Sequence, residues 1–559
     1  MRPSRRRHLH HPTYLIMFFR FVLLLALLST LSARAQSTWQ ATTNKNWETS
    51  ANWSDGVPNS ETAVAEFGDS DQPVVNIVGT LTVDQILFTI DAIAYTFFQK
   101  GGSSLVLAGD GIANESAFAP IFDVKANDEG RARLAFTNSA TAADAVISVK
   151  GTSTKPGKID FLDTSSAGTA QISVLSAGAV TFENSATAAN AKITIDDAGG
   201  NVTFKNISTT ANADIQVKAD ASLVFSGRSS AGSANILASY APDRLAPVAA
   251  AQITFTGNAT AGNATIDTTR LDFSGDASGG NATFTVRGYT NFRDSSTGGS
   301  ATFTVKGGQQ FSFLDSSSLG NANVILERGS GINFRSNASG GSGSISGEGW
   351  LYKNGAGTVV LSGANTYSGY TEIAGGKFFV NGSLTNTSLV DINEGATLGG
   401  SGSIDRAVFI HSGARLEPGS ASGTAGTLSF GYALIFANNS TLDFDLGTVS
   451  DLIRITSGWI SGPSGEGGIT LNLFDSGGFT AGTYTLFDFS AGDIDLDDFD
   501  LHDFAFGTTI EGFNYSLGFG ENSLTLTATA SAIPEPSTYA ALFGLLALGF
   551  AAWRKRRSR

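Results

Sequence analysis

The chain has 559 residues, of which 41% are hydrophobic, 15% are charged and 66 are glycine. This hydrophobic fraction is too high for a disordered chain, and the lack of any cysteine excludes disulfide bonds and thiolate chemistry. Eleven of the 35 Lys and Arg residues lie in residues 1–35 and 554–559, so the rest of the chain carries 24 basic against 49 acidic residues. So acidic a body argues against nucleic acid as a partner, whereas divalent cations and cationic surfaces remain open.

Residues 1–35 are typical of a secretory signal peptide. Four arginines precede position 8, and an apolar stretch that we expect to be helical follows at 14–31. Ala33 and Ala35 then form an A-x-A cleavage site, which would leave Gln36 as the first residue after processing. An uncleaved membrane anchor is the alternative, but such an anchor would not require the A-x-A cleavage site.

Residues 36–115 form an opening module that contains Trp39, Trp47 and Trp53. Three tryptophans can form a platform on which sugar rings stack. They can equally seal the open end of a solenoid, because terminal repeats need a cap. We favour an N-terminal capping β module, since tryptophan is usually packed inside a protein.

Residues 116–348 repeat with a period of about 21 residues, which is in the range of solenoid proteins. Each repeat has a phenylalanine, usually with an apolar residue two positions before it, a small polar residue eight positions after it and, almost without exception, an alanine nine positions after it. The phenylalanines are Phe136, Phe161, Phe182, Phe204, Phe225, Phe255, Phe273, Phe292, Phe313 and Phe334, and the alanines are Ala145, Ala170, Ala191, Ala213, Ala234, Ala264, Ala282, Ala301 and Ala322.

Two short runs in each repeat have apolar residues at alternate positions, which predicts strands with one buried face. One repeat offers about five buried side chains at roughly 1.5–3 kcal/mol each, whereas ordering about 21 residues costs on the order of 20–40 kcal/mol. The repeats must therefore stack and share hydrogen bonds. We predict an all-β fold, a right-handed parallel β-helix with Phe on Phe and Ala on Ala inside it, and a ladder of the small polar residues at a turn.

Between Phe225 and Phe255 the period is longer, so residues 226–252 contain an insertion, which includes Pro242 and Pro247. We expect it to project as a loop from one coil. Loops on rigid scaffolds often carry binding functions, but a tolerated surface insertion needs no function. The sequence leaves its role open.

Residues 349–458 contain a recognisable pattern at 353–382. It begins with Gly355 and Gly357, continues with an apolar strand and an Asn-Thr-Tyr-Ser-Gly turn at 365–369, and ends with two glycines at 375–376. This pattern resembles the autotransporter-associated β-strand repeat, and the segment 47–67 resembles the start of many secreted bacterial proteins that carry that repeat. The resemblance implies about one coil of parallel β-helix, continued to about residue 458, and no catalytic chemistry.

Residues 459–532 remain β-like and aromatic, which predicts a C-terminal β cap. They include an acidic run at 493–503, in which carboxylate oxygens could hold Ca²⁺, although the run lacks the glycine spacing of a calcium-binding loop. Acidic and apolar residues alternate there, which also fits a strand with an acidic solvent face. The acidic residues are Asp493, Asp495, Asp497, Asp498, Asp500 and Asp503.

Residues 533–559 have three parts: Pro534-Glu535-Pro536, the apolar stretch Tyr539–Trp553 and a basic end that begins at Arg554. This order resembles the PEP-CTERM sorting signal of Gram-negative bacteria. The resemblance implies that Pro534, Glu535 and Pro536 are recognised by an exosortase, a transient partner that releases or transfers the protein. The apolar stretch, about 22 Å long as a helix, predicts a transmembrane helix with its basic end in the cytoplasm. A plain tail anchor is the alternative.

We find no candidate catalytic residue, metal site or cofactor site. Only His411 and His502 lie outside residues 1–35, and the outward strand positions of residues 116–348 show no paired carboxylates. We therefore predict a non-enzymatic, exported scaffold or adhesin-like protein, first anchored in the inner membrane and then placed at the outer surface or in the extracellular matrix. Its sorting links it, through the resemblance, to biofilm and to extracellular polysaccharide. The alternative is a β-helical carbohydrate-active enzyme, a polysaccharide lyase or hydrolase, or a carbohydrate-binding protein.

Overall fold

The computed structural model describes residues 35–196, 199–238, 250–491, 495–531 and 536–558. The chain divides into two compact units, Met1–Ile193 and Thr194–Arg559, and each is described by itself. The signal peptide up to residue 34, the part of the predicted insertion at 239–249, and Asp493, Pro534 and Glu535 lie outside the described residues.

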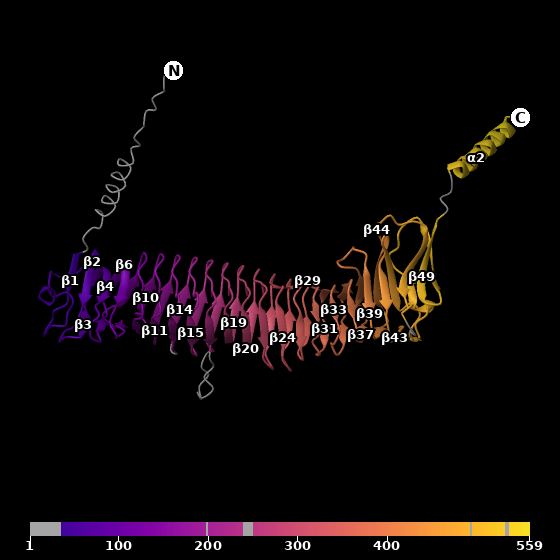
Figure 1. Ribbon diagram of the computed structural model, residues 1–559. Helices are drawn as coiled ribbons and strands as arrows, with labels where there is room; N and C mark the ends of the chain where they lie inside the picture. The colour runs from indigo at the N-terminus through magenta and orange to yellow at the C-terminus, as the bar shows by residue number, and fades with distance from the viewer. Residues whose placement is uncertain (1–34, 197–198, 239–249, 492–494, 532–535, 559) are drawn as a thin grey trace, which may run out of the picture. The chain divides into compact units, whose positions relative to one another are not determined.

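The regular elements of the first unit are strands that run side by side, together with one short 3-10 helix among its described residues (Figure 1). Its elements are β1 (Ala35–Thr38), the 3-10 helix η1 (Ser50–Asn52), β2 (Ser60–Phe67), β3 (Val74–Ile77), β4 (Thr80–Phe88), β5 (Thr96–Gln99), β6 (Ser104–Asn114), β7 (Ile121–Lys125), β8 (Arg133–Phe136), β9 (Val146–Lys150), β10 (Gly157–Phe161), β11 (Gln171–Val174) and β12 (Gly178–Phe182), and it ends within β13 (Lys192–Ile195).

Two series of parallel strands make up this unit. One runs β1-β2-β4-β6-β8-β10-β12 and the other β3-β5-β7-β9-β11. The register places Phe161 opposite Phe136 on one neighbouring strand and Phe182 on the other. Equivalent residues of successive coils therefore lie one above another, as a β-solenoid requires.

The second unit contains more strands, a 3-10 helix and one α-helix. Its elements are β14 (Asn201–Phe204), β15 (Asp214–Val217), β16 (Ser222–Phe225), β17 (Asn235–Ala238), β18 (Gln252–Phe255), β19 (Thr265–Phe273), β20 (Thr283–Phe292), β21 (Thr302–Val305), β22 (Gln310–Phe313), β23 (Ser318–Gly320), β24 (Asn323–Leu326), β25 (Gly331–Phe334), β26 (Ser339–Gly341), β27 (Ile345–Gly347), β28 (Trp350–Lys353), β29 (Thr358–Leu361), β30 (Ala364–Asn365), β31 (Thr371–Ile373), β32 (Gly376–Val380), β33 (Ser383–Leu384), β34 (Val390–Ile392), β35 (Ala396–Gly400), β36 (Ser403–Ile404), β37 (Val408–Ile410), β38 (Arg415–Pro418), β39 (Thr427–Phe430), β40 (Ala433–Phe436), β41 (Ser440–Gly447), β42 (Leu452–Ile455), β43 (Trp459–Ser461), β44 (Ile469–Gly477), β45 (Gly482–Asp488), β46 (Asp495–Asp497), η2 (Leu501–Asp503), β47 (Phe504–Phe506), β48 (Phe513–Phe519), β49 (Ser523–Ala530) and α2 (Pro536–Arg557).

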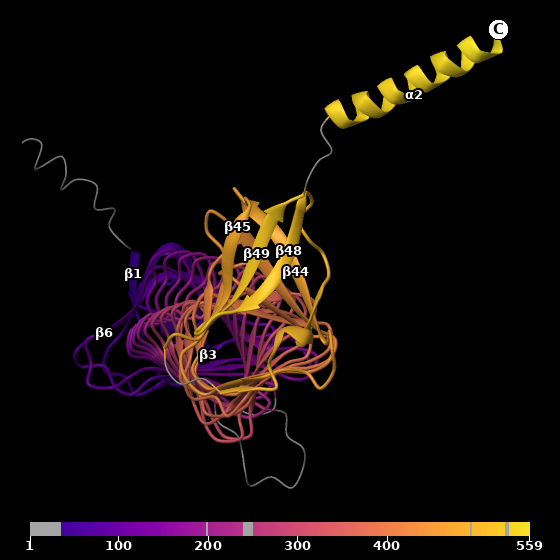
Figure 2. The same ribbon diagram turned by 90° about the vertical axis from the view of Figure 1, so that its right-hand side faces the viewer.

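Parallel pairing also dominates the second unit. From β28 onward three series stack, namely β28-β31-β34-β37-β40-β43-β46, β29-β32-β35-β38-β41-β44-β47 and β30-β33-β36-β39-β42-β45. The third series ends differently, because β49 pairs antiparallel with both β45 and β48 (Figure 2). This antiparallel end falls within the predicted C-terminal cap, whose capping role stays a prediction.

The predicted phenylalanine column is confirmed in each unit. In the first unit the rings of Phe136, Phe161 and Phe182 stack with centroids 4.6–4.8 Å apart. In the second unit six successive pairs from Phe204 to Phe334 stack at 4.4–5.3 Å. These spacings match the distance between neighbouring strands. The parallel β-solenoid follows from this column, whereas its right-handed sense stays a prediction.

The alanine column is also buried, and a turn precedes it in each coil. All nine predicted alanines are fully buried. The residue two positions before each alanine has a positive φ, as at Ala211 (51°) and Gly232 (52°). In most of these coils a Ser or Thr two positions earlier accepts a hydrogen bond from its N–H, as Thr209 does from Ala211 (3.0 Å). The predicted polar ladder is present between Asn281 and Asn263, whose side-chain amides form a hydrogen bond (3.3 Å), and most of the small polar side chains at this position are exposed.

The three tryptophans of the opening module are packed inside the first unit. Trp39, Trp47 and Trp53 are at most 2% exposed, and the ring centroids of all three lie 5.6–5.9 Å from that of Phe67. Each indole N–H donates to a backbone carbonyl, so the polar edge of each ring is also satisfied. This burial rules out an exposed sugar platform at these residues, and the capping role stays a prediction.

A lysine continues the phenylalanine column of the second unit. Lys353 lies opposite Phe334 and is fully buried. Its ammonium donates hydrogen bonds to the carbonyls of Gly355 (2.8 Å) and Gly375 (3.0 Å). Burial lowers the pKa of Lys353 to about 8. The column therefore changes from aromatic packing to a polar anchor where the predicted repeat begins.

Helix α2 confirms the predicted C-terminal helix. Its apolar side chains from Leu542 to Trp553 include seven that are 50–70% exposed, and its last turn carries Arg554, Lys555, Arg556 and Arg557. In the described part of the chain, no helix has the length and hydropathy that crossing a bilayer requires. The predicted membrane crossing is therefore not confirmed.

Candidate functional site

Charged and polar side chains gather on the outward face of five neighbouring strands of the second unit, β32, β35, β38, β41 and β44. Side chains alternate along a strand, so Leu416 and Leu442 are buried in the core while Glu417 and Asp443 face outward. The register sets Lys377 beside Thr397, and Thr397 beside Arg415. It likewise sets Asp443 beside Asn472, and Asp445 beside Phe474. Residues distant in the sequence thus become neighbours.

The loop 419–426 forms one wall of this region. Gly419 begins it with φ 110°, and a side chain there would collide with the carbonyl of Thr424, so only glycine fits. Asn381 donates a hydrogen bond to the carbonyl of Ser420 (2.9 Å), and Lys377 bonds to the hydroxyl of Ser422. These contacts hold the loop against the coil.

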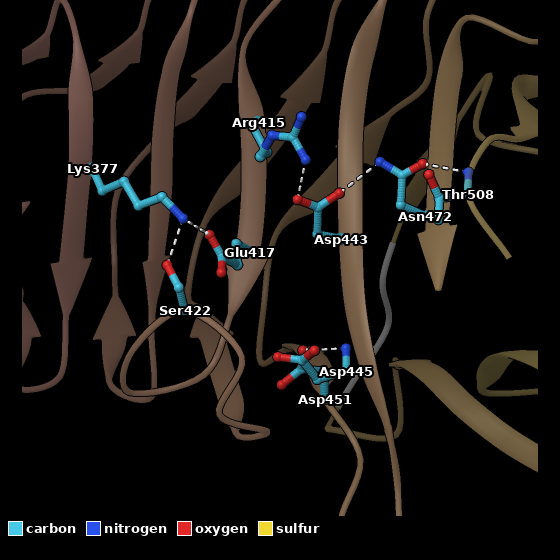
Figure 3. A network of polar contacts seen from close by, with 9 residues as sticks. All are labelled: Lys377, Arg415, Glu417, Ser422, Asp443, Asp445, Asp451, Asn472 and Thr508. Atoms are coloured by element: carbon cyan, nitrogen blue, oxygen red, sulfur yellow. Dashed lines mark hydrogen bonds and ion pairs between the residues drawn. The ribbon is translucent and has the colours of Figure 1, made fainter. Parts of the chain in front are cut away.

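Two sets of polar contacts cross the strands (Figure 3). Lys377 pairs with Glu417 at 2.9 Å. Arg415 pairs with Asp443, whose other oxygen accepts a hydrogen bond from the amide of Asn472 (2.8 Å). The oxygen of Asn472 in turn accepts from the N–H of Thr508 (2.8 Å). Each cation is therefore matched to one carboxylate.

Asp451 contacts the wall loop and strand β41 and has a structural role. It is 1% exposed, and its two oxygens accept from the N–H groups of Gly426 and Asp445, both at 2.7 Å. It thereby joins the wall loop to strand β41. Burial raises the pKa of Asp451 to about 7, against the two hydrogen bonds, which lower it.

Asp445 is the remaining carboxylate. Burial, together with the charges of Glu417 and Asp443, raises its pKa, and the smaller effect of the Lys377 charge opposes that shift. Its neighbour Phe474 is 39% exposed. Asp445 is thus an acid in a partly desolvated position beside an exposed aromatic ring.

These side chains line a cavity of about 530 Å³, which we call the polar pocket. Its volume is in the range of small-molecule sites. Within the described residues, no group of three or more His, Asp or Glu side chains is arranged to hold a metal ion. The arrangement is suited to binding a polar molecule through hydrogen bonds. The pocket is lined by Lys377, Thr397, Arg415, Glu417, Gly423, Asp443, Asp445 and Phe474.

The sequence did not reveal this pocket. The available signal is local: Asp443 and Asp445 occupy alternate outward positions of one strand, where most coils of residues 116–348 carry Thr, Ser or Asn. The contribution of Lys377, 40 residues before Glu417, depends on the register of successive coils.

The acidic run at 493–503 is not one continuous strand. Strand β46 covers only Asp495–Asp497, and the chain then turns into η2, which Asp500 caps by accepting from the N–H of His502 (2.7 Å). Asp503 completes the capping box by accepting from the N–H of Asp500 (2.9 Å). The expected alternation fails because these side chains hold a helical turn instead of lining one strand face.

Two sequence families match parts of the chain. Residues 351–377 match the family described as Passenger-associated-transport-repeat, and residues 532–557 match the one described as PEP-CTERM protein-sorting motif. The chain carries a passenger-associated-transport repeat and a PEP-CTERM sorting motif. Both resemblances expected from the sequence are therefore confirmed.

Similarity to whole proteins is partial. Over 122 residues the chain is 33% identical to the Adhesin BmaC autotransporter of Brucella suis biovar 1 (strain 1330). The matched region is 20% of this chain and 4% of that protein. The match to the crystal structure of the Haemophilus influenzae Hap adhesin has 11% sequence identity and a TM-score of 0.25. It covers 85% of this chain and 64% of the Hap chain. The chain thus spans a small part of the first relative and less than two thirds of the second.

The passenger-associated-transport repeat uses its polar residues to hold coils together. Asn365 is 1% exposed, donates to the carbonyl of Gly363 (2.9 Å) and accepts from the N–H of Ile345 (3.0 Å). Tyr367, also 1% exposed, bonds to the hydroxyl of Thr371 (2.6 Å). The Asn-Thr-Tyr turn is therefore structural.

The predicted processing residues fall at the edges of the described chain. Ala33 lies outside it, whereas Ala35 and Gln36 belong to β1, where Ala35 pairs with Ala63 and the amide of Gln36 bonds to Glu66. Of the PEP-CTERM triplet, only Pro536 is described, as the first residue of α2. The roles of these residues stay predictions.

Proposed function

We propose that this chain is an exported, adhesin-like β-solenoid protein of the cell surface or extracellular matrix, without enzymatic activity. The observation that carries the proposal is the PEP-CTERM motif at 532–557 in a chain that also has a passenger-associated-transport repeat. The partial match to an autotransporter named as an adhesin supports the adhesive role. Stacked coils suit that role because a solenoid presents long, rigid outer faces.

In this proposal an exosortase recognises Pro534, Glu535 and Pro536 at the inner membrane. Helix α2 contacts the membrane before processing through its exposed apolar side chains, and its basic last turn stays on the cytoplasmic side. At the other end, a signal peptidase cleaves after Ala35 and leaves Gln36 first.

The test is a chain in which Pro534, Glu535 and Pro536 are all replaced by alanine, compared with Ser537→Ala as the matched control. We expect the wild type and the control to reach the outer surface in a shortened form, and the triple variant to remain with the inner membrane at full length. Cell fractionation and intact mass spectrometry measure location and size. A triple variant with unaltered location and size would contradict the proposal.

One observation favours a second candidate, a β-helical carbohydrate-active enzyme. Glu417, Asp443 and Asp445 face one pocket, and glycoside hydrolysis uses a pair of carboxyl groups. However, Glu417 and Asp443 are held in ion pairs, which leaves Asp445 without a second free carboxylate. Release of new reducing or unsaturated sugar ends by the purified chain, lost in Asp445→Ala, would establish this candidate in place of the first.

A further inference from the structure

One carboxylate of the polar pocket has no partner. Asp445 lines the cavity and is 7% exposed, yet across the described ranges no group donates a hydrogen bond or forms an ion pair with its carboxylate; its contacts with Asp451 are made by its backbone N–H and C=O. The other two carboxylates are matched to Lys377 and Arg415. A carboxylate withdrawn from water is unfavourable unless it is paired. A ligand that donates hydrogen bonds would supply the missing partner.

The mixed charge of the pocket restricts the ligand. A cationic ligand would approach Lys377 and Arg415, and an anionic one would approach Glu417, Asp443 and Asp445, all within one cavity. Lys377 and Arg415 are already paired with Glu417 and Asp443, so an added charge of either sign would compete with these ion pairs. A neutral molecule with several hydroxyl groups leaves both ion pairs in place, and its hydroxyl groups both donate and accept hydrogen bonds.

The remaining wall of the pocket fits the same ligand. Phe474 lies beside Asp445 in the strand register and exposes 39% of its surface. An exposed ring offers an apolar surface to the C–H face of a sugar, while the neighbouring carboxylate accepts from its hydroxyl groups. Arg415 can donate as well, since a guanidinium has five N–H donors.

We propose that the polar pocket binds a neutral saccharide, with Asp445 (Figure 3) accepting hydrogen bonds from its hydroxyl groups and Phe474 packing against its ring. The inference names the ligand class for the proposed adhesin and rests on that role only for its biological setting. Lys377 and Arg415 hold Glu417 and Asp443 in place, and the wall loop 419–426 closes one side.

The test uses the purified full-length chain on an array of neutral, amino and acidic glycans, followed by calorimetric titration of the best neutral glycan. We expect neutral glycans to bind, and Asp445→Ala to weaken that binding about 10- to 100-fold, which corresponds to one hydrogen bond to a charged group. The matched control is Glu521→Ala, which removes an exposed carboxylate outside the pocket and should change the affinity less than about twofold.

A second readout separates binding from structural support. Because Asp445→Ala removes a buried, unpaired carboxylate, we expect a higher melting temperature together with the weaker binding. A residue that only supports the fold would lower the melting temperature when replaced. Phe474→Ala should also weaken binding.

Three results would overturn the inference: no neutral glycan bound, binding of charged glycans alone, or unchanged affinity in Asp445→Ala. These results are distinguishable from failure of the proposed function. A chain that binds neutral glycans but never reaches the surface would overturn the sorting proposal and leave the pocket assignment intact. A chain that reaches the surface but binds no neutral glycan would do the reverse.

Discussion

Replacing Phe292 by alanine tests the aromatic column of the second unit. Phe292 is fully buried and stacks between Phe273 (4.4 Å) and Phe313 (4.8 Å). Phe303 and Phe311 meet it edge-on at 5.8 and 5.6 Å. Removing the ring therefore breaks four aromatic contacts and leaves a cavity between coils whose backbones are fixed by their ladders.

The expected loss of stability in Phe292→Ala is large for the removal of a single side chain. Burial and cavity terms for Phe→Ala in a core amount to about 3–5 kcal/mol, and aromatic pairs add to simple area burial. With four ring neighbours we expect the upper part of that range, about 4–5 kcal/mol. This corresponds to roughly a 700- to 4,000-fold increase in the equilibrium constant for local opening.

Hydrogen exchange followed by mass spectrometry is the suitable assay, because a long repeat array does not unfold in a single two-state step. In Phe292→Ala, the hydrogen-exchange protection of peptides that cover β20 should fall roughly 700- to 4,000-fold. The matched control is Arg293→Ala, the adjacent exposed residue, which should change protection about twofold or less. A loss of protection below about fivefold in Phe292→Ala would refute the claim that stacked rings hold these coils together.

Three further changes test single features of the second unit. Ala211 has φ 51° where the next coil has Gly232 at 52°, so Ala211→Gly should raise local stability by about 0.5–1 kcal/mol, and weaker hydrogen-exchange protection of peptides that cover β15 would contradict this. Burial raises the pKa of Asp451 from 3.8 to about 7. The free energy of unfolding of the wild type should therefore fall by up to about 4 kcal/mol relative to that of Asp451→Asn as the pH rises between these values. Parallel pH profiles of stability for the two proteins would contradict the raised pKa. Burial lowers the pKa of Lys353 from 10.5 to about 8. The wild type should therefore gain stability relative to Lys353→Met as the pH rises from about 8 to 10.5. A stability difference between the two proteins that does not change with pH would argue against a buried ammonium.

The sequence was sufficient to predict the repeating coils. A phenylalanine and an alanine recur at fixed offsets, and parallel in-register pairing is the arrangement that stacks equivalent residues. Thus Phe161 lies opposite Phe136 and Phe182, as the period implies. The helix at the C-terminal sorting motif was also predictable, from its uninterrupted apolar run.

The polar pocket and the lysine in the column could not be predicted in the same way. Lys377 and Glu417 are 40 residues apart, and which outward residues of different coils become neighbours depends on the length of every turn between them. The loop 419–426 then covers them, although its sequence is typical of an exposed turn. The burial of Lys353 could not be predicted because charged residues rarely occupy buried positions. Its ammonium is accommodated there by carbonyls from two separate turns.

Labelling of intact cells with a membrane-impermeant amine reagent is the most direct test of the surface location. Lys150, Lys192 and Lys218 are exposed on the coils of the folded chain. If the chain is a surface protein, these lysines should carry the label before the cells are broken, as read by peptide mass spectrometry. Labelling that occurs only after lysis would place the coils inside the cell envelope and contradict the proposed function.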